Sequence, residues 1–201
     1  MSSLTILYLH GLTSSYMSSR GKFLRELLPK NNILTPDIPL NAHVALKFLL
    51  DLVSREEPDI IVGSSMGGLF AHQLPASKKI LINPAFTTSS VMARYKGLRL
   101  RFYHERFNPD EKDFEVTDEL LRSYTEVESE QWNAIKSKDA DATVGIFSLQ
   151  DEVIREDALF DKYYKKKIYI EATHQLSYKE MEDFVIPEIE NFRNSKLICP
   201  Q

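Results

Sequence analysis

The segment Ile60-Ile61-Val62-Gly63-Ser64-Ser65-Met66-Gly67-Gly68 decides the fold of this chain. Its three β-branched residues predict a buried strand, and the glycines after Ser65 predict a helix that begins at once after a sharp turn. Gly63, Ser65 and Gly67 fit the pattern G-x-S-x-G, in which a serine hydroxyl projects from a strained turn. Glycines two residues away on either side let strand and helix approach. Because Ser64 has no such pair of glycines, the pattern predicts Ser65 as the nucleophile.

Strand and helix patterns alternate on both sides of this segment. Short apolar, β-prone runs predict strands at 4–9, 32–35, 59–62, 79–82, 143–148 and 167–170. Apolar residues at helical spacing predict helices at 23–28, 44–52, 67–74, 157–164 and 179–192. Pro187 should kink the last helix or restart it. The alternation predicts a single-domain α/β fold over residues 1–201, with one mostly parallel sheet and helices on both faces.

Residues 87–141 interrupt the alternation. The segment is rich in charged and aromatic residues and carries no strong strand pattern. We therefore expect irregular or short helical pieces, in a lid-like insert over the edge of the sheet formed by the carboxyl ends of the strands. Such an insert either shapes an acyl pocket or simply packs over the sheet, and the sequence favours neither interpretation.

Composition excludes several classes of protein. The chain has 201 residues, 43% of them hydrophobic and 27% charged, which is typical of one globular domain. The formal net charge is −4 and there is no polybasic stretch, which argues against nucleic acid or an acidic membrane surface as a partner. A lone cysteine, Cys199, permits neither an intrachain disulfide nor a zinc site of several thiolates, and we expect no role for it. No apolar run suits a signal peptide or a membrane span, so we expect a cytoplasmic protein.

A serine hydroxyl needs a base and a carboxylate that orients it. For this type of turn the chain order is serine, then Asp or Glu, then His. His174 is the only histidine that follows a late strand, and Asp151 follows the strand before it. One helix and one strand separate the two residues, so both should lie at the same end of adjacent strands. Glu152 is the alternative acid.

A transition-state oxyanion needs hydrogen-bond donors. Gly11 permits a sharp turn after the first strand, so the backbone N–H groups of Leu12 and Met66 are the predicted oxyanion hole. His10 is expected to build this turn rather than to act as base. This chemistry needs neither a metal nor an organic cofactor, and the remaining histidines have no metal-ligand spacing and are expected to be packed or at the surface; they are His43, His72 and His104.

Taken in order, these residues resemble the α/β-hydrolase superfamily and, more narrowly, the YqiA-like small bacterial esterases. The matching pieces are Tyr8-Leu9-His10-Gly11-Leu12, Pro36-Asp37-Ile38-Pro39, Gly63-Ser64-Ser65-Met66-Gly67-Gly68-Leu69-Phe70-Ala71, Ile82-Asn83-Pro84-Ala85, Asp151-Glu152-Val153 and His174. The resemblance implies a compact hydrolase whose triad is Ser65, Asp151 and His174. It also implies that the substrate is a carboxylic ester or thioester of a small acyl group, cleaved through an acyl-enzyme.

Two features depart from that resemblance. Glu171-Ala172-Thr173 precede the histidine where the family usually has small or glycine residues, and the insert is unusually charged. A second hypothesis is therefore a binding module that keeps the hydrolase scaffold without turnover. A third is C–C bond cleavage or acyl transfer by similar residues. The acyl chain length and the oligomeric state do not follow from the sequence.

Overall fold

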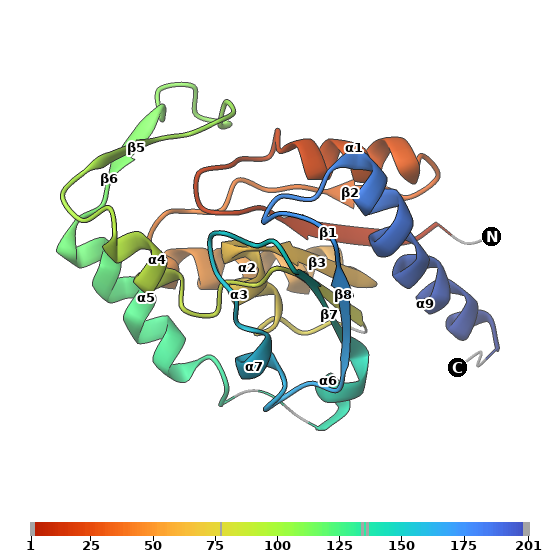
Figure 1. Cartoon of the computed structure of the whole chain (residues 1–201). Coiled ribbons are helices and arrows are strands. Elements are labelled where there is room, and N and C mark those ends of the chain that lie inside the picture. Colours follow the sequence, from red (N-terminus) through yellow and green to blue (C-terminus); the bar gives the residue numbers. More distant parts are fainter. Residues whose placement is uncertain (1–2, 77, 134, 136, 199–201) are drawn as a thin grey trace.

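A parallel sheet of six strands forms the centre of the molecule, in the order β2-β1-β3-β4-β7-β8 (Figure 1). The computed structural model describes residues 3–76, 78–133, 135 and 137–198. Every neighbouring pair of strands in this sheet is parallel. The strands are β1 (Thr5–Leu9), β2 (Asn32–Leu34), β3 (Ile60–Ser64), β4 (Lys78–Ile82), β7 (Thr143–Ser148) and β8 (Lys166–Ile170). The predicted parallel sheet is confirmed.

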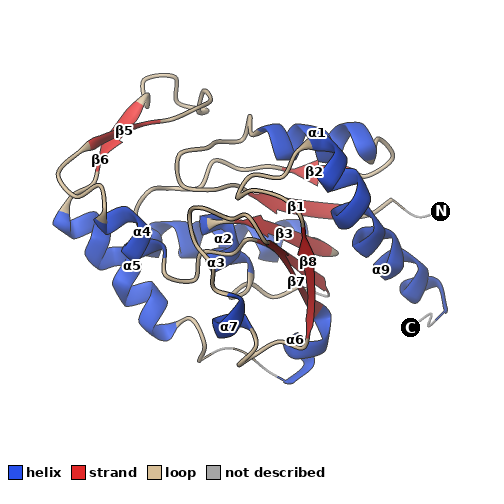
Figure 2. Cartoon of the chain, in the orientation of Figure 1, coloured by secondary structure: helices blue, strands red, loops and turns tan. Residues whose placement is uncertain are grey.

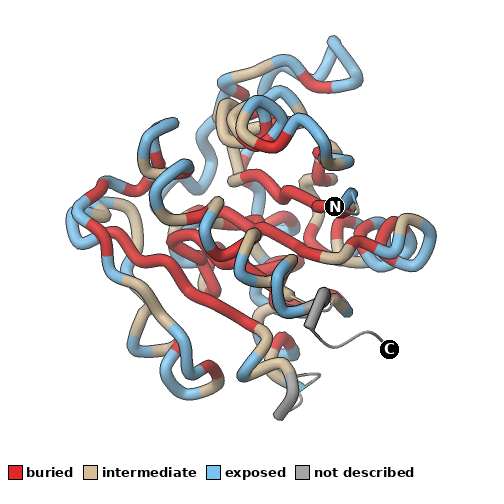
Figure 3. Tube along the Cα trace, turned by 90° about the vertical axis from the view of Figure 1, so that its right-hand side faces the viewer, coloured by how far each residue is buried: buried red, intermediate tan, exposed pale blue. Residues whose placement is uncertain are grey.

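Helices cover both faces of the sheet (Figure 2). Successive residues of β1 point to opposite faces, because side chains alternate along a strand. Ile6 and Tyr8 belong to one hydrophobic cluster, and Leu7 and Leu9 belong to the other. The cluster of Ile6 and Tyr8 also contains residues of α1 (Ser19–Leu27), η1 (Met181–Val185) and α9 (Ile186–Ile198). The cluster of Leu7 and Leu9 also contains residues of α2 (Ala42–Glu56), α3 (Met66–Ala71), α5 (Asp118–Glu130) and α7 (Asp157–Phe160). Figure 3 shows that burial is concentrated in the strands between these layers.

The segment between β4 and β7 contains two strands that the sequence pattern did not predict. β5 (Arg99–Arg101) and β6 (Asp113–Glu115) pair antiparallel in a hairpin that projects from the body of the molecule (Figure 1). Strands of three residues are too short to show a periodic pattern, and an ion pair between Arg99 and Asp113 holds them across the hairpin. The prediction of an insert without strands was wrong at these positions.

Helices α4 (Thr88–Ala93), α5 and α6 (Ser137–Ala142) are the helical parts of the remaining insert. α5 is a full helix of 13 residues, longer than the predicted short pieces. Its N-cap is Thr117, and its buried side chains Leu120, Tyr124 and Val127 recur at the spacing of one helix face. Two charged residues between these positions, Arg122 and Glu126, masked the pattern in the sequence.

The last helical segment is interrupted as Pro187 predicts. α8 (Tyr178–Glu180) leads into the π-helical turn η1, and α9 begins at Ile186, so that Pro187 lies in its first turn. α7 ends at Phe160, earlier than the predicted end of this helix at residue 164. Among the described residues, no helix is both long and apolar enough to cross a membrane. Cys199 lies outside the described residues.

Candidate active site

Ser65 lies in a sharp turn between β3 and α3. Its φ is 54° and its ψ is −121°, a backbone conformation that non-glycine residues rarely adopt. Hydrogen bonds hold this strained residue from both sides, because its N–H donates to the carbonyl of Ile82 (3.0 Å) and its carbonyl accepts from the N–H of Ala85 (3.0 Å). The end of β4 therefore keeps the Ser65 hydroxyl in place.

Glycine is required at both flanking positions. A Cβ on Gly63 would lie 2.4 Å from the carbonyl oxygen of Gly67, inside the turn itself. A Cβ on Gly67 would lie 2.1 Å from the carbonyl oxygen of Leu9, at the end of β1. Both distances are shorter than any van der Waals contact, so the two glycines let α3 approach the sheet as the sequence pattern indicates.

The structure brings together the three side chains that the sequence singled out. His174 Nε2 lies 2.9 Å from Ser65 Oγ, and His174 Nδ1 lies 2.7 Å from Asp151 Oδ2. An ionised carboxylate only accepts hydrogen bonds, so Nδ1 carries the proton and Nε2 is free to accept from the serine hydroxyl. The arrangement therefore directs the hydroxyl proton of Ser65 toward a basic nitrogen.

The Asp151 carboxylate is held on both of its oxygens. Oδ1 accepts hydrogen bonds from the backbone N–H groups of Val153 (2.8 Å) and Ile154 (3.0 Å), while Oδ2 faces His174. Burial raises the pKa of this carboxyl, but the hydrogen bonds from His174 and the two N–H groups outweigh burial, so the net pKa lies below its usual value. Asp151 is thus ionised at neutral pH.

Glu152, the alternative acid, contacts the backbone and not the imidazole ring. Its Oε2 accepts a hydrogen bond from the N–H of His174 at 3.3 Å. The geometry therefore gives the ring contact to Asp151 and leaves Glu152 as a support for the loop that carries the histidine.

His10 forms the turn next to Ser65, as the sequence predicts. Its Nδ1 donates to the carbonyl of Gly11 (2.8 Å), and its Nε2 accepts from the N–H of Ile38 (3.2 Å). Burial is the main cause that lowers the pKa of His10 to about 4, so the ring is neutral at pH 7. A Cβ on Gly11 would lie 3.5 Å from the Cβ of Ser65, which places this turn directly against the serine.

Leu12 and Met66 lie on the two segments expected to supply oxyanion donors. Leu12 follows the turn at Gly11, and Met66 is the first residue of α3. The N–H of a first-turn helical residue has no acceptor within its own helix, so that of Met66 is available to a ligand. In the described parts of the chain, no group of three or more His, Cys, Asp or Glu side chains is placed to hold a metal ion.

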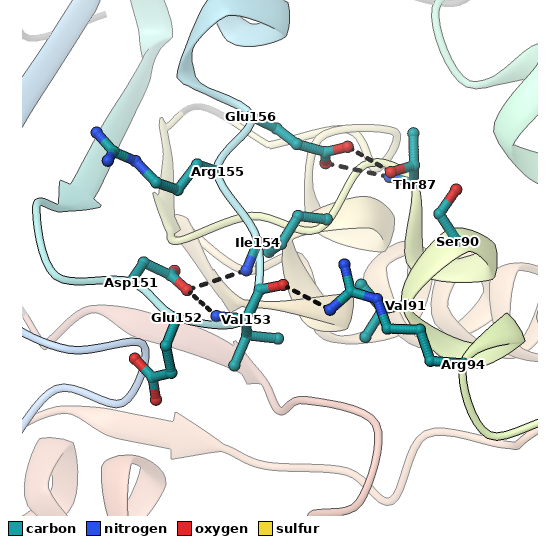
Figure 4. A pocket seen from close by; sticks show the side chains of 10 residues that line it. All are labelled: Thr87, Ser90, Val91, Arg94, Asp151, Glu152, Val153, Ile154, Arg155 and Glu156. Atoms are coloured by element: carbon teal, nitrogen blue, oxygen red, sulfur yellow. Dashed lines mark hydrogen bonds between the residues drawn. The ribbon is translucent and has the colours of Figure 1, made fainter.

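A cavity of about 370 Å³ borders Asp151 (Figure 4). It lies between α4 and the loop that carries the acid, and its lining residues are Thr87, Ser90, Val91, Arg94, Asp151, Glu152, Val153, Ile154, Arg155 and Glu156. Figure 4 shows Arg94, the residue that follows α4, donating to the carbonyl of Val153 (3.3 Å), while Glu156 accepts hydrogen bonds from Thr87. The insert and the acid loop therefore share one hollow that both polar and apolar side chains line.

Asn83 is a buried polar residue at the site to which the sequence assigned no role. It directly follows β4, and its side chain bonds to the carbonyl of His174 and to Ser148, three residues before Asp151. The available signal was an asparagine at the carboxyl end of an apolar strand, which is the edge where the other site residues lie.

Comparison with known families decides where this chain belongs. A model with the description "Uncharacterised protein family (UPF0227)" matches residues 5–193. The chain belongs to this family. The match covers nearly the whole α/β unit of the UPF0227 protein, including all three side chains of the site. The predicted resemblance to YqiA-like α/β hydrolases is confirmed.

Solved structures of distant sequence share the fold. One comes from work on LipS and LipT, two metagenome-derived lipolytic enzymes, with a TM-score of 0.69, 16% identity, and coverage of 96% of this chain and 94% of the other. Est1E from Butyrivibrio proteoclasticus has a TM-score of 0.67 and 15% identity, with coverage of 98% and 90%. Monoacylglycerol lipase from Paleococcus ferrophilus has a TM-score of 0.61 and 15% identity, with coverage of 94% and 93%. At these identities, the likeness establishes the α/β-hydrolase fold of the UPF0227 protein.

Proposed function

We propose that this UPF0227 protein is a serine hydrolase that cleaves carboxylic ester or thioester bonds of small acyl substrates. The observation that carries the proposal is the continuous hydrogen-bonded chain from Ser65 through His174 to Asp151. The lipolytic and esterase activities named for the structural neighbours agree with it. The distance of 2.9 Å between hydroxyl and imidazole lies within the range expected of a nucleophile and its base. It therefore favours the enzyme over a binding module that lost turnover.

The reaction begins when Ser65 Oγ attacks the carbonyl carbon and His174 Nε2 takes the hydroxyl proton. The tetrahedral intermediate collapses as the bond to the leaving oxygen or sulfur breaks, and the imidazolium gives its proton to the leaving group. A water molecule then attacks the acyl-enzyme, with His174 again accepting a proton. The acid product leaves, and Ser65 regains its hydrogen.

Asp151 and two backbone donors stabilise the charges that develop. The carboxylate of Asp151 keeps the proton on Nδ1 and stabilises the imidazolium. We assign the oxyanion to the N–H groups of Leu12 and Met66, which belong to the two segments that meet at Ser65. No metal or organic cofactor takes part in this scheme.

Neither Ser65 nor His174 lines the hollow next to Asp151, so we propose this hollow only for a part of the substrate remote from the bond that is cleaved. Its volume of about 370 Å³ lies in the range of small-molecule sites. The hydroxyls, charged groups and apolar side chains that line it can hold such a part when its polarity is mixed. Nucleic acid is not a proposed partner, and the cytoplasmic location stays a prediction from the sequence.

The experiment that tests the proposal follows Ser65 directly. Ser65→Ala should abolish turnover of short p-nitrophenyl esters and thioesters while the circular dichroism spectrum stays native. A fluorophosphonate probe should label Ser65 in the native protein, with the adduct located by peptide mass spectrometry. Ser129→Ala, on the exposed face of α5, is the control that should keep both activities. Full turnover in Ser65→Ala, or an adduct on Ser64, would reject the assignment.

A further inference from the structure

The side chain of Asn83 connects the loops that carry His174 and Asp151. Its Nδ2 donates to the carbonyl of His174 (2.9 Å) and to the hydroxyl of Ser148 (2.8 Å), and it lies 3.4 Å from the carbonyl of Thr173. Its Oδ1 accepts from the N–H of Ser148 (2.7 Å). Ser148 ends β7, three residues before Asp151. A single buried amide therefore bonds to both loops.

The backbone around Asn83 holds the third member of the site. Ile82 and Ala85, on either side of Asn83, make the two backbone hydrogen bonds to Ser65. Asn83 itself has a φ of 42°, in the left-handed region that asparagine tolerates better than most residues, and its N–H donates to the carbonyl of Ile146. The turn after β4 thus contacts the segments of serine, acid and base at once.

The orientation of this amide is determined by its partners. A carbonyl oxygen of His174 can only accept, and the N–H of Ser148 can only donate, so the amide nitrogen and oxygen cannot exchange places. An aspartate of the same size would lack both N–H donors. Its carboxylate would face the carbonyl of His174 with two acceptors in contact.

We infer that Asn83 is a positioning residue for the reaction proposed above, and the inference rests on that proposed function. Asn83 holds the main chain of His174 so that Nε2 stays within hydrogen-bond distance of Ser65 Oγ. It acts through the backbone and touches neither the imidazole ring nor a substrate. A displacement of about 1 Å in such a geometry lowers turnover by as much as roughly 100-fold.

The test compares Asn83→Ala and Asn83→Asp with the native protein. We expect kcat for a short p-nitrophenyl ester to fall by about 10- to 100-fold in both, with KM changed by less than about 3-fold, because the loss affects geometry and not substrate contacts. The far-downfield proton NMR signal of the His174 Nδ1–H should weaken or shift. A role in stability alone would leave that signal and kcat unchanged at temperatures where the variant is folded.

Gln131 offers a matched control. Its amide is also buried, donates to the carbonyls of Phe86 (3.1 Å) and Glu128 (2.9 Å), and accepts from His72, away from the three side chains of the site. Gln131→Ala should lower the melting temperature while kcat stays within about 2-fold of the native value. Ser148→Ala removes one acceptor of Asn83 but spares the bond to His174, and should lower kcat by less than about 3-fold.

The outcomes separate this inference from the proposed function. If the native protein hydrolyses the ester, and the Asn83 variants keep both its kcat and its NMR signal, the inference is overturned. The proposed function then stands. If the native protein neither hydrolyses esters nor reacts with a fluorophosphonate, the proposed function fails, and the NMR signal still decides whether Asn83 positions His174. Should Asn83→Ala fail to fold, Asn83→Asp decides the question, since it keeps the side-chain volume.

Discussion

Two buried imidazoles, one in the helical layer and one at the edge of the sheet, show how burial and a partner determine what a histidine can do. His72 Nδ1 lies 3.1 Å from the hydroxyl of Tyr164, and its Nε2 lies 3.0 Å from the amide oxygen of Gln131. His174 has the same number of ring partners, but one is the carboxylate of Asp151. The two rings differ in charge environment rather than in burial.

The rings of His72 and His174 therefore differ in how readily each can take up a proton. Burial, assisted by the positive charge of Lys79, lowers the pKa of His72 to about 3, so this ring stays neutral and serves packing. A carboxylate at Nδ1 stabilises an imidazolium when the ring accepts a proton at Nε2. A buried histidine is therefore suited to be a base only where a negative partner faces its far nitrogen.

The largest effect is expected when the charge of Asp151 is removed. Asp151→Asn should lower kcat for ester hydrolysis by roughly 10³- to 10⁴-fold, because the amide favours the wrong imidazole tautomer and stabilises no positive charge. Steady-state kinetics at pH 7 measure the loss, and circular dichroism checks the fold. A decrease of less than about 10-fold would show that the carboxylate does not orient the base.

The next test replaces the neutral ring. His72→Leu leaves the buried hydroxyl of Tyr164 and amide of Gln131 without their ring partner, so the free energy of unfolding should fall by about 2 kcal/mol. The kcat of the folded variant should match that of the native protein. Urea denaturation and ester hydrolysis measured on the same sample give both values. A large loss of kcat would mean that the core around His72 also supports the reaction.

The stability of the protein should also depend on pH through its buried neutral histidines. His10 and His72 have folded-state pKa values of about 4 and 3, below the ordinary 6.5, so the unfolded chain binds more protons. Their contribution to stability is present above pH 6.5 and is lost as the pH falls toward these folded-state values. Between pH 6.5 and pH 5 we expect the free energy of unfolding to fall by about 2 kcal/mol for each ring. Urea titrations of native protein and His72→Leu should converge as the pH falls.

The smallest effect is expected for a histidine that has a carboxylate partner but no burial. His43 Nε2 lies 2.8 Å from Glu126, and both side chains are more than half exposed. His43→Gln should change the free energy of unfolding by less than about 1 kcal/mol and leave kcat unchanged, because solvent screens the pair. Raising the salt concentration should reduce even this difference. A larger effect would indicate that the contact between α2 and α5 depends on the pair.

Local sequence determined much of the fold and one residue of the site. The strand, the two glycines and Ser65 lie within nine residues, so short-range geometry is enough to predict the turn. The alternation of strand and helix patterns likewise predicted a parallel sheet. The sequence did not predict the hairpin β5–β6. Its three-residue strands lie on a projecting segment and are stabilised by each other, so they show no periodic apolar face that a sequence pattern could reveal.

By itself, the sequence predicted Ser65 as the nucleophile and the chain order of acid and base, and it determined the sheet that carries them. Only the tertiary structure decided that Asp151 and not Glu152 faces the imidazole, and that Asn83 joins the loops of acid and base. The reason is distance along the chain. Each of these contacts joins residues more than 20 positions apart, and a choice between two adjacent carboxylates depends on the course of a loop that no local pattern encodes.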